Sequence, residues 1–141
     1  MAAEQALQTL ETWHDLLEKR DFDRLRSIAA DTVVFRSPAF FTPYPGVAPL
    51  VHIIETVNTI FEDFVYHRTF WSEGHKSVVL EFSARVGEKK LKGVDIIAFD
   101  DDGKIEEFEV MIRPANAAAA VGEAMAAKAG PRLKELLGKP V

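Results

Sequence analysis

The chain has 141 residues, of which 48% are hydrophobic and 28% are charged, and its net charge is −5. This length and balance are typical of one domain with a single core, and the absence of a basic patch argues against nucleic acid as a partner. The absence of cysteine excludes disulfides and thiolate metal sites. The chain start lacks a signal-peptide pattern and no apolar run reaches the ~20 residues of a membrane span, so we expect a cytoplasmic protein without a membrane partner.

The first half of the chain predicts three helices around one strand. Apolar residues recur at spacings of three and four over residues 3–19, which indicates a helix with one apolar stripe. A shorter helix begins after a possible N-cap at Asp21 and ends at Asp31. The β-branched and aromatic segment 32–36 predicts a strand, and the stripe over residues 47–61 predicts a third helix.

Residues 37–46 cannot form regular structure, because three prolines each remove a backbone donor and fix φ. The same segment holds three aromatic side chains, Phe40, Phe41 and Tyr44. Such a loop is rigid and has a large apolar area to bury. It is therefore either a lid on the core or one wall of a pocket, since loops on rigid scaffolds often carry function.

The second half predicts four successive strands and a C-terminal helical part. Residues 64–71 and 76–86 predict the first two strands, and two more flank a hairpin turn at residues 100–103. An alanine-rich helix follows to about Lys128, Gly130-Pro131 breaks it, and a last short helix covers 132–137. Helices followed by a run of strands indicate an α+β fold, in which a curved sheet closing over helices forms a cone.

Asp95 is the residue in this pattern that most needs an explanation. It lies inside an apolar strand, between Val94 and Ile96. A carboxylate in such a place needs a partner, or its pKa rises. We therefore expect either a pocket acid that donates or accepts a proton, or a structural acid bonded to Trp13, a backbone amide or a histidine.

Three parts of the sequence are informative together: the segment Phe35-Arg36-Ser37-Pro38, Gly46 before the third helix, and the hairpin Gly-Val-Asp-Ile-Ile-Ala-Phe-Asp-Asp-Asp-Gly-Lys-Ile (residues 93–105). They resemble the nuclear transport factor 2-like superfamily, and within it the SnoaL-like proteins. The resemblance covers about residues 7–114. It implies a cone with three N-terminal helices packed on a strongly curved, mostly antiparallel sheet, a C-terminal helix, a deep apolar pocket and a homodimer formed through the sheet. Some members are enzymes, such as ketosteroid isomerase, SnoaL cyclase and limonene epoxide hydrolase.

The resemblance can be compared residue by residue. Relative to ketosteroid isomerases, Asp95 takes the place of the acid that donates to the substrate oxyanion, and Trp13 that of a tyrosine donor. Ser37 stands where the general-base aspartate precedes a proline, and serine at its ordinary acidity does not take a proton from carbon. The epoxide hydrolase pattern needs an arginine two residues before Asp95, where this chain has Gly93.

We expect one domain over residues 1–141, with a core of about 7–114 and a helical extension over 115–138.

The expected function is binding of a small apolar, polyketide-like or steroid-like carbonyl compound, with isomerase, cyclase or hydratase chemistry by Asp95. The alternative is a ligand-binding or dimeric interaction module without catalysis. His67 is a second catalytic candidate if its strand face is concave. The expected ligand-binding residues are Trp13, Phe35, Ser37, Phe41, Tyr44, Asn58, Phe61, Phe82, Phe108 and Val110. No cofactor is expected, and no metal, because no dependable metal-ligand spacing is present.

Overall fold

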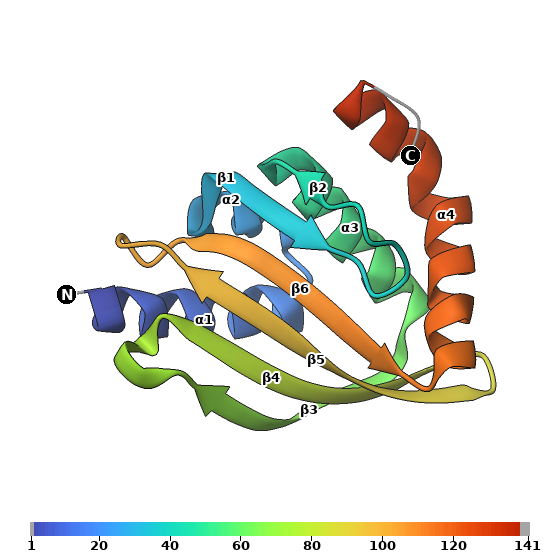
Figure 1. Cartoon of the computed structure of the whole chain (residues 1–141), viewed down its shortest axis with the longest axis horizontal. Helices are drawn as coiled ribbons and strands as arrows, with labels where there is room; N and C mark the ends of the chain where they lie inside the picture. Colours follow the sequence, from blue (N-terminus) through green and yellow to red (C-terminus); the bar gives the residue numbers. More distant parts are fainter. Residues whose placement is uncertain (1, 139–141) are drawn as a thin grey trace.

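The computed structural model describes residues 2–138 (Figure 1). In chain order the elements are α1 (Ala2–Lys19), η1 (Phe22–Arg24), α2 (Leu25–Ile28), β1 (Ala29–Arg36), β2 (Tyr44–Pro45), α3 (Val47–Ile60), β3 (Glu62–Trp71), η2 (Glu73–His75), β4 (Ser77–Val86), β5 (Lys89–Phe99), β6 (Ile105–Arg113) and α4 (Ala115–Leu137).

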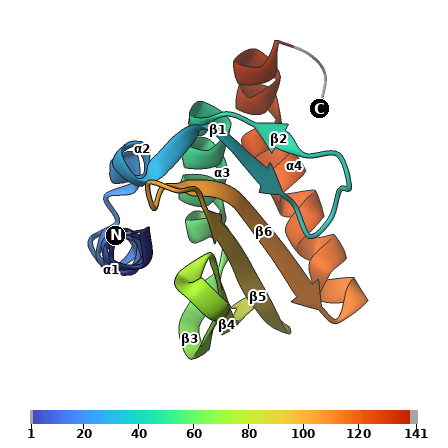
Figure 2. The same ribbon diagram turned by 60° about the vertical axis from the view of Figure 1, so that its left-hand side comes forward.

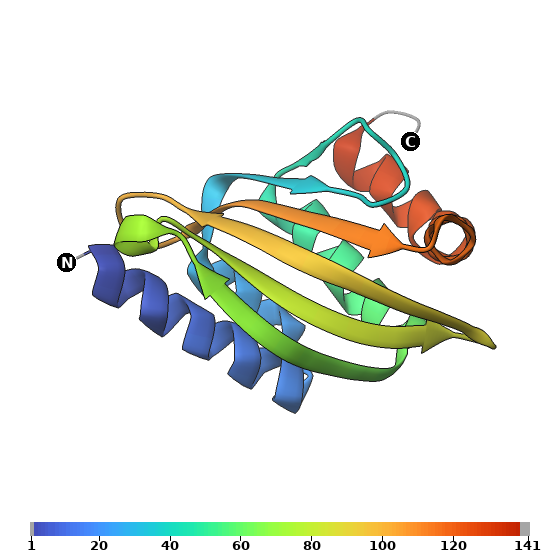
Figure 3. The ribbon, with the colours of Figure 1, turned by 60° about the horizontal axis from the view of Figure 1, so that its bottom comes forward.

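One curved sheet organises the fold, with the strand order β2-β1-β6-β5-β4-β3. The β1–β6 pair is parallel and the other pairs are antiparallel. Figures 2 and 3 show the long strands curving, with α3 and α4 on the same side of the sheet. The α+β class predicted from the order of helices and strands is confirmed.

The hairpin between β5 and β6 is fixed to the first helix by its turn. Gly103 has φ +75°, and a Cβ on it would lie 2.5 Å from Cβ of Gln5, so this position needs glycine for both conformation and space. Thr9 of α1 donates from Oγ1 to the Gly103 carbonyl over 2.6 Å. The turn therefore sets the position of β5, which carries Asp95, relative to α1, which carries Trp13.

Three features differ from the sequence prediction. Tyr44–Pro45 forms the short strand β2, paired with β1, inside the segment 37–46 that was expected to have no regular structure. The strand β1 begins at Ala29, so Asp31 lies in the strand rather than at the end of the helix. The expected break at Gly130-Pro131 is wrong, because α4 runs from Ala115 to Leu137 with Pro131 inside it. A helix accommodates an internal proline by bending, and Figure 1 shows α4 changing direction in its last turns. Leu133, which follows Pro131 in this helix, is buried against the core.

Within residues 2–138, no helix combines the length and apolar character that crossing a membrane requires.

Candidate functional site

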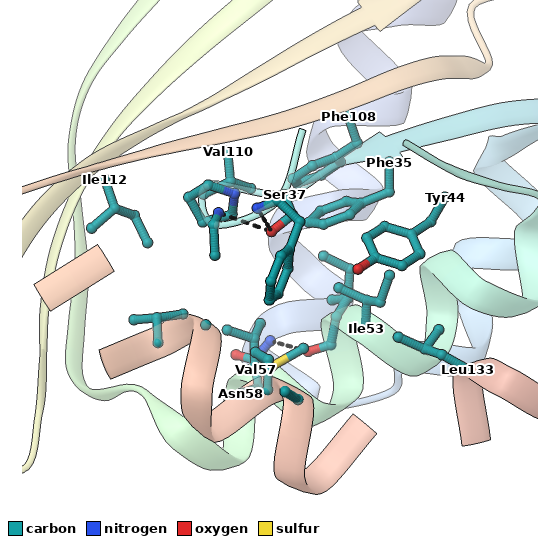
Figure 4. A pocket seen from close by; sticks show the side chains of 18 of the residues that line it. Phe35, Ser37, Tyr44, Ile53, Val57, Asn58, Phe108, Val110, Ile112 and Leu133 are labelled. Carbon is teal, nitrogen blue, oxygen red and sulfur yellow. Dashed lines mark hydrogen bonds between the residues drawn. The ribbon is translucent and has the colours of Figure 1, made fainter. Parts of the chain in front are cut away.

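A cavity of about 680 Å³ lies between the concave sheet face, α3, α4 and the loop 37–43. Its walls are mainly apolar side chains, and Figure 4 shows Phe35, Phe108, Val110 and Ile112 opposite Ile53, Val57 and Leu133. The polar residues on its walls are Ser37, Thr42, Tyr44, Asn58, Tyr66, Asp95 and Lys134. A mainly apolar cavity with few polar groups is the usual form of a small-molecule site, and the volume lies within the common range of ~300–1,000 Å³.

Asp95 is the one carboxyl group among the described residues that line this cavity. It lies in the middle of β5, opposite Leu80 of β4 and Val110 of β6, and only 6% of it is exposed. The alternation along β5 turns it to the concave face, between the buried residues Leu91 and Ile97.

Three side chains from three elements form a hydrogen-bonded chain that ends at Asp95. Trp13 of α1 donates from Nε1 to the hydroxyl oxygen of Tyr66 over 3.0 Å. Tyr66 of β3 in turn donates to Oδ2 of Asp95 over 2.5 Å. The chain fixes the orientation of the carboxyl group, because Oδ2 is occupied by a hydroxyl that is itself held in place.

Burial raises the pKa of Asp95 to about 7, and the hydrogen bond from Tyr66 opposes part of that rise. Burial, followed by the charge of Asp95, raises the pKa of Tyr66 well above its usual value, so Tyr66 remains a donor. Near neutral pH the carboxyl group therefore exists in both forms, which suits a group that takes and returns a proton.

The second carboxyl oxygen, Oδ1, is accessible from the cavity that Asp95 lines. The hydrogen bond from Tyr66 is the only one that the Asp95 side chain makes within residues 2–138, and it uses Oδ2. No fully buried side-chain oxygen or nitrogen in that part of the chain lacks a partner. Oδ1 is consequently not sealed in the core, and a ligand in the cavity can reach it.

Aromatic rings pack against Tyr66, the middle residue of this hydrogen-bonded chain. Phe64 and Phe82 pack on Tyr66 with ring centroids 4.8 and 6.4 Å away, both edge to face. His14 meets Tyr66 at 5.3 Å, also edge to face, and burial lowers the pKa of His14, which favours its neutral form. These three neighbours of the Tyr66 ring are therefore uncharged. They add no charge close to the carboxyl group of Asp95, which Tyr66 contacts.

Ser37 lies on the same wall, just after β1. Its Oγ accepts hydrogen bonds from the backbone N–H groups of Ala39 (3.0 Å) and Phe40 (3.3 Å), both drawn in Figure 4. The loop that follows rests on α4, where a Cβ on Gly122 would lie 2.6 Å from Cβ of Ala39. The close approach of loop and helix therefore sets the position of Ser37.

The structure brings most of the residues expected to bind a ligand to the cavity. Trp13, Phe35, Ser37, Tyr44, Asn58, Phe61, Phe108 and Val110 all line it. The loop 37–43 forms one of its walls, which decides between the two interpretations left open by the sequence. Whether these residues bind a ligand remains a prediction.

Three expected site residues lie elsewhere, which corrects their predicted placement. Phe41 is 97% exposed at the tip of the loop, and its neighbour Phe40 lines the cavity instead. Phe82 is fully buried behind Tyr66 rather than on the wall. His67 lies on the outer face of the sheet, where its Nε2 is 2.7 Å from Oγ of Ser83, because neighbouring residues of a strand point to opposite faces and Tyr66 points inward.

Sequence reasoning missed two features of this site. It did not identify Tyr66 as the partner of Asp95; the alternation of Phe64 and Tyr66 in β3 is the signal that could have placed both on the inner face. It also treated the C-terminal helix as an extension, whereas α4 supplies Val121, Met125, Leu133 and Leu137 to the cavity wall.

Comparison with known proteins identifies the fold. The family model of the SnoaL-like domain matches residues 10–108. A crystal structure described as a steroid delta-isomerase from Pseudomonas aeruginosa is 49% identical, with 95% of each chain covered and a TM-score of 0.84. An uncharacterised bacterial protein with a cystatin-like fold from Silicibacter pomeroyi is 32% identical over 84% of this chain and 83% of its own, with a TM-score of 0.78.

A more distant structure shares the fold. An LEH-like epoxide hydrolase from M. tuberculosis is 16% identical over 93% of this chain and 94% of its own, with a TM-score of 0.60. No curated protein matches the sequence. The family model and the two closer structures together cover the curved sheet and the cavity described above. The chain therefore belongs to the SnoaL-like family.

Proposed function

We propose that this protein binds a small, largely apolar carbonyl compound in the cavity and isomerises it, with Asp95 taking and returning the proton. The observation that carries this proposal is the position of Asp95, the one carboxyl group on the wall of an apolar cavity, with Oδ2 held by Tyr66 and Oδ1 open to a ligand. The 49% identical structure described as a steroid delta-isomerase supports a steroid-like ligand.

The chemistry uses only groups that this chain supplies. Oδ1 of ionised Asp95 removes a proton from a carbon near the carbonyl group, the electron pair of that C–H bond forms a new C=C bond, and the carbonyl oxygen becomes negative. Asp95 then returns the same proton to a different carbon, which moves the double bond and restores the carbonyl. A base with a pKa of about 7 is suited to both halves of this exchange at neutral pH.

Trp13 and Tyr66 position the base in this mechanism. Their hydrogen bonds hold Asp95 in one orientation, so that Oδ1 keeps its direction toward the cavity while the proton moves. The mainly apolar wall offers the carboxylate few polar partners, which keeps it a stronger base than it would be in water.

A second candidate function is ligand binding without turnover. Ser37 favours this alternative, because a serine hydroxyl needs an adjacent base before it can react. Among the described residues that line the cavity there is no second carboxylate and no imidazole to serve as that base. In this alternative Asp95 is a hydrogen-bonding contact for the ligand.

A steroid whose C=C bond is not conjugated with its 3-oxo group tests the two candidates. Conjugation on isomerisation is followed by ultraviolet absorbance, and binding of the conjugated product is followed by thermal shift. We expect turnover by the natural protein, a loss of at least ~100-fold in Asp95→Asn, and no change in Phe41→Ala, whose side chain lies outside the cavity. Binding by both proteins without turnover by either would support the second candidate, and no binding by either would reject both.

We also propose that two copies associate through the outer face of the sheet. Val65, Phe70 and Met111 are each about half exposed there (51%, 50% and 50%). Around them lie the ion pairs of Glu81 with Arg68 (2.6 Å) and Lys92 (3.1 Å). Apolar side chains with surrounding charges are typical of an interface between protein subunits. Location in the cytoplasm stays a prediction from the sequence.

A further inference from the structure

The hydroxyl of Ser37 can act toward a ligand only as a donor. Its oxygen already accepts two backbone N–H groups, those of Ala39 and Phe40. A serine oxygen has two acceptor positions and one hydrogen. Within residues 2–138 no group accepts that hydrogen, and Ser37 lines the cavity. The remaining capacity of this side chain is therefore one hydrogen, which an acceptor in the cavity can take.

The strand register places Ser37 at the same level as Asp95. Arg36 pairs with Glu109 in the parallel β1–β6 ladder, so Ser37, the next residue, is level with Val110. On the other side of β6, Val110 pairs with Asp95. Ser37 and Asp95 thus flank Val110 from the two neighbouring strands. Two strand spacings separate their backbones by ~10 Å.

We propose that Ser37 donates its hydrogen to the carbonyl oxygen of the ligand, and that the carbon which loses its proton lies at Asp95. This inference rests on the proposed function. It makes Ser37 a catalytic residue, since the hydroxyl contacts the atom on which negative charge develops. It also fixes the direction of the ligand, with its carbonyl group toward the loop 37–43 and not toward the carboxyl group.

The spacing agrees with this orientation. A hydrogen bond from Ser37 occupies ~2.7 Å, and a carbon ready to react lies ~3–3.5 Å from the base. The two backbones lie ~10 Å apart, and both side chains extend into the cavity between them, so one small compound can contact both groups. Val110 forms the floor between them.

Ser37 is well arranged to stabilise the charge that forms. When Asp95 takes the proton, the electron pair of the C–H bond moves into the new C=C bond and the carbonyl π pair moves to the oxygen. The hydrogen bond from Ser37 then ends on an anionic oxygen, which strengthens it. The two N–H groups that donate to Oγ polarise the hydroxyl in the same direction.

Binding of 4-nitrophenol tests the proposed orientation of the ligand. At a pH above the pKa of 4-nitrophenol, its phenolate oxygen carries a negative charge like that on the oxygen of the enolate. We expect Ser37→Ala to weaken this binding at least 10-fold. We expect Asp95→Asn to leave it unchanged or tighter, since that change removes a negative charge from the cavity. The opposite pattern, with loss in Asp95→Asn and none in Ser37→Ala, would overturn the inference, because the oxygen would then lie at Asp95.

A second variant keeps the loop intact. Ser37→Asp retains an acceptor for the N–H groups of Ala39 and Phe40 but has no hydrogen to donate, so we expect steroid turnover to fall at least 10-fold, mainly through kcat. Ser37→Thr, which keeps a hydroxyl, is expected to recover part of the turnover. A gain of turnover in Ser37→Asp would show that position 37 serves as a base position and would overturn the inference.

The outcomes separate this inference from the proposed function. If the natural protein turns over the steroid, Asp95→Asn does not, and all Ser37 variants are as active as the natural protein, only the inference fails. If the natural protein neither turns over the steroid nor binds the phenolate, both fail. Phe41→Ala serves as the control for changes in the same loop, because its side chain is 97% exposed.

Discussion

The hydroxyl of Tyr66 donates a hydrogen bond to Oδ2 of Asp95 over 2.5 Å. Together with the hydrogen bond from the indole of Trp13 to Tyr66, it connects α1, β3 and β5. Tyr66 lowers the pKa of Asp95 while burial raises it, and burial has the larger effect. The carboxyl group is consequently a titrating group near neutral pH and not a permanent charge. The following experiments depend on that balance and on the contacts around it.

Removing the hydroxyl of residue 66 should raise the pKa of Asp95. Tyr66→Phe deletes the one hydrogen bond that stabilises the carboxylate, so we expect a pKa above the present value of about 7. If Asp95 is a base, kcat/KM rises with pH through this pKa, and the rise moves to higher pH in Tyr66→Phe. Carbon NMR of the carboxyl group measures the same shift directly.

Tyr44→Phe is the matched control for that measurement, because Tyr44 also lines the cavity but has no bond to Asp95. It should leave the pKa of Asp95 in place. A fall of kcat/KM with rising pH in the natural protein would instead show that the protonated form of Asp95 is the active one.

Asp95→Asn should change how stability depends on pH. The pKa of Asp95 is higher in the folded protein, about 7, than its ordinary value of 3.8, so the folded state binds more protons between these values. Its contribution to stability is therefore fully present below about pH 4 and is lost as the pH rises toward 7. This difference between the two pKa values corresponds to at most ~4 kcal/mol in the free energy of unfolding.

Urea unfolding of both proteins from pH 4 to pH 8 measures this effect. We expect the stability of Asp95→Asn relative to the natural protein to increase steadily across that range. A difference that does not vary with pH would mean that Asp95 titrates normally in the folded state.

Gly122→Ala should disturb the loop that carries Ser37. The added Cβ would lie 2.6 Å from Cβ of Ala39, so the loop or α4 must shift. We expect weaker ligand binding by thermal shift and a loss of ~1–3 kcal/mol in the free energy of unfolding, as for other overpacked sites. Gly130→Ala in the same helix is the stability control, because its Cβ meets no atom within 4 Å and should gain up to ~1 kcal/mol from helix propensity.

Met111→Lys should convert the proposed dimer to a monomer. Met111 is half exposed at the centre of the outer sheet face, and a charge there would be buried against the second copy. Sedimentation velocity at micromolar concentration measures the change. Leu7→Lys on α1, also partly exposed but away from this face, should leave the dimer intact. A natural protein that sediments as a monomer contradicts the proposal.

The sequence alone determined the class of fold and the most unusual residue. Alternation of apolar residues in β4, β5 and β6, together with the glycine turn at Gly103, is a local signal that survives in the structure. Asp95 could be identified because a single acid in an apolar strand is costly wherever the strand is placed. Eight of the expected cavity residues could be found because they are the large or polar residues of inward-facing positions.

Only the tertiary structure decided the partners of these residues. The bond between Tyr66 and Asp95 joins side chains 29 residues apart, and the contact of Ala39 with Gly122 joins a loop to the last helix. The facing of His67 and the exposure of Phe41 likewise depend on how β3 and the loop pack, not on local pattern. Periodicity tells which side of one element is buried, but contacts between elements follow from strand order, curvature and close packing, which no single segment encodes.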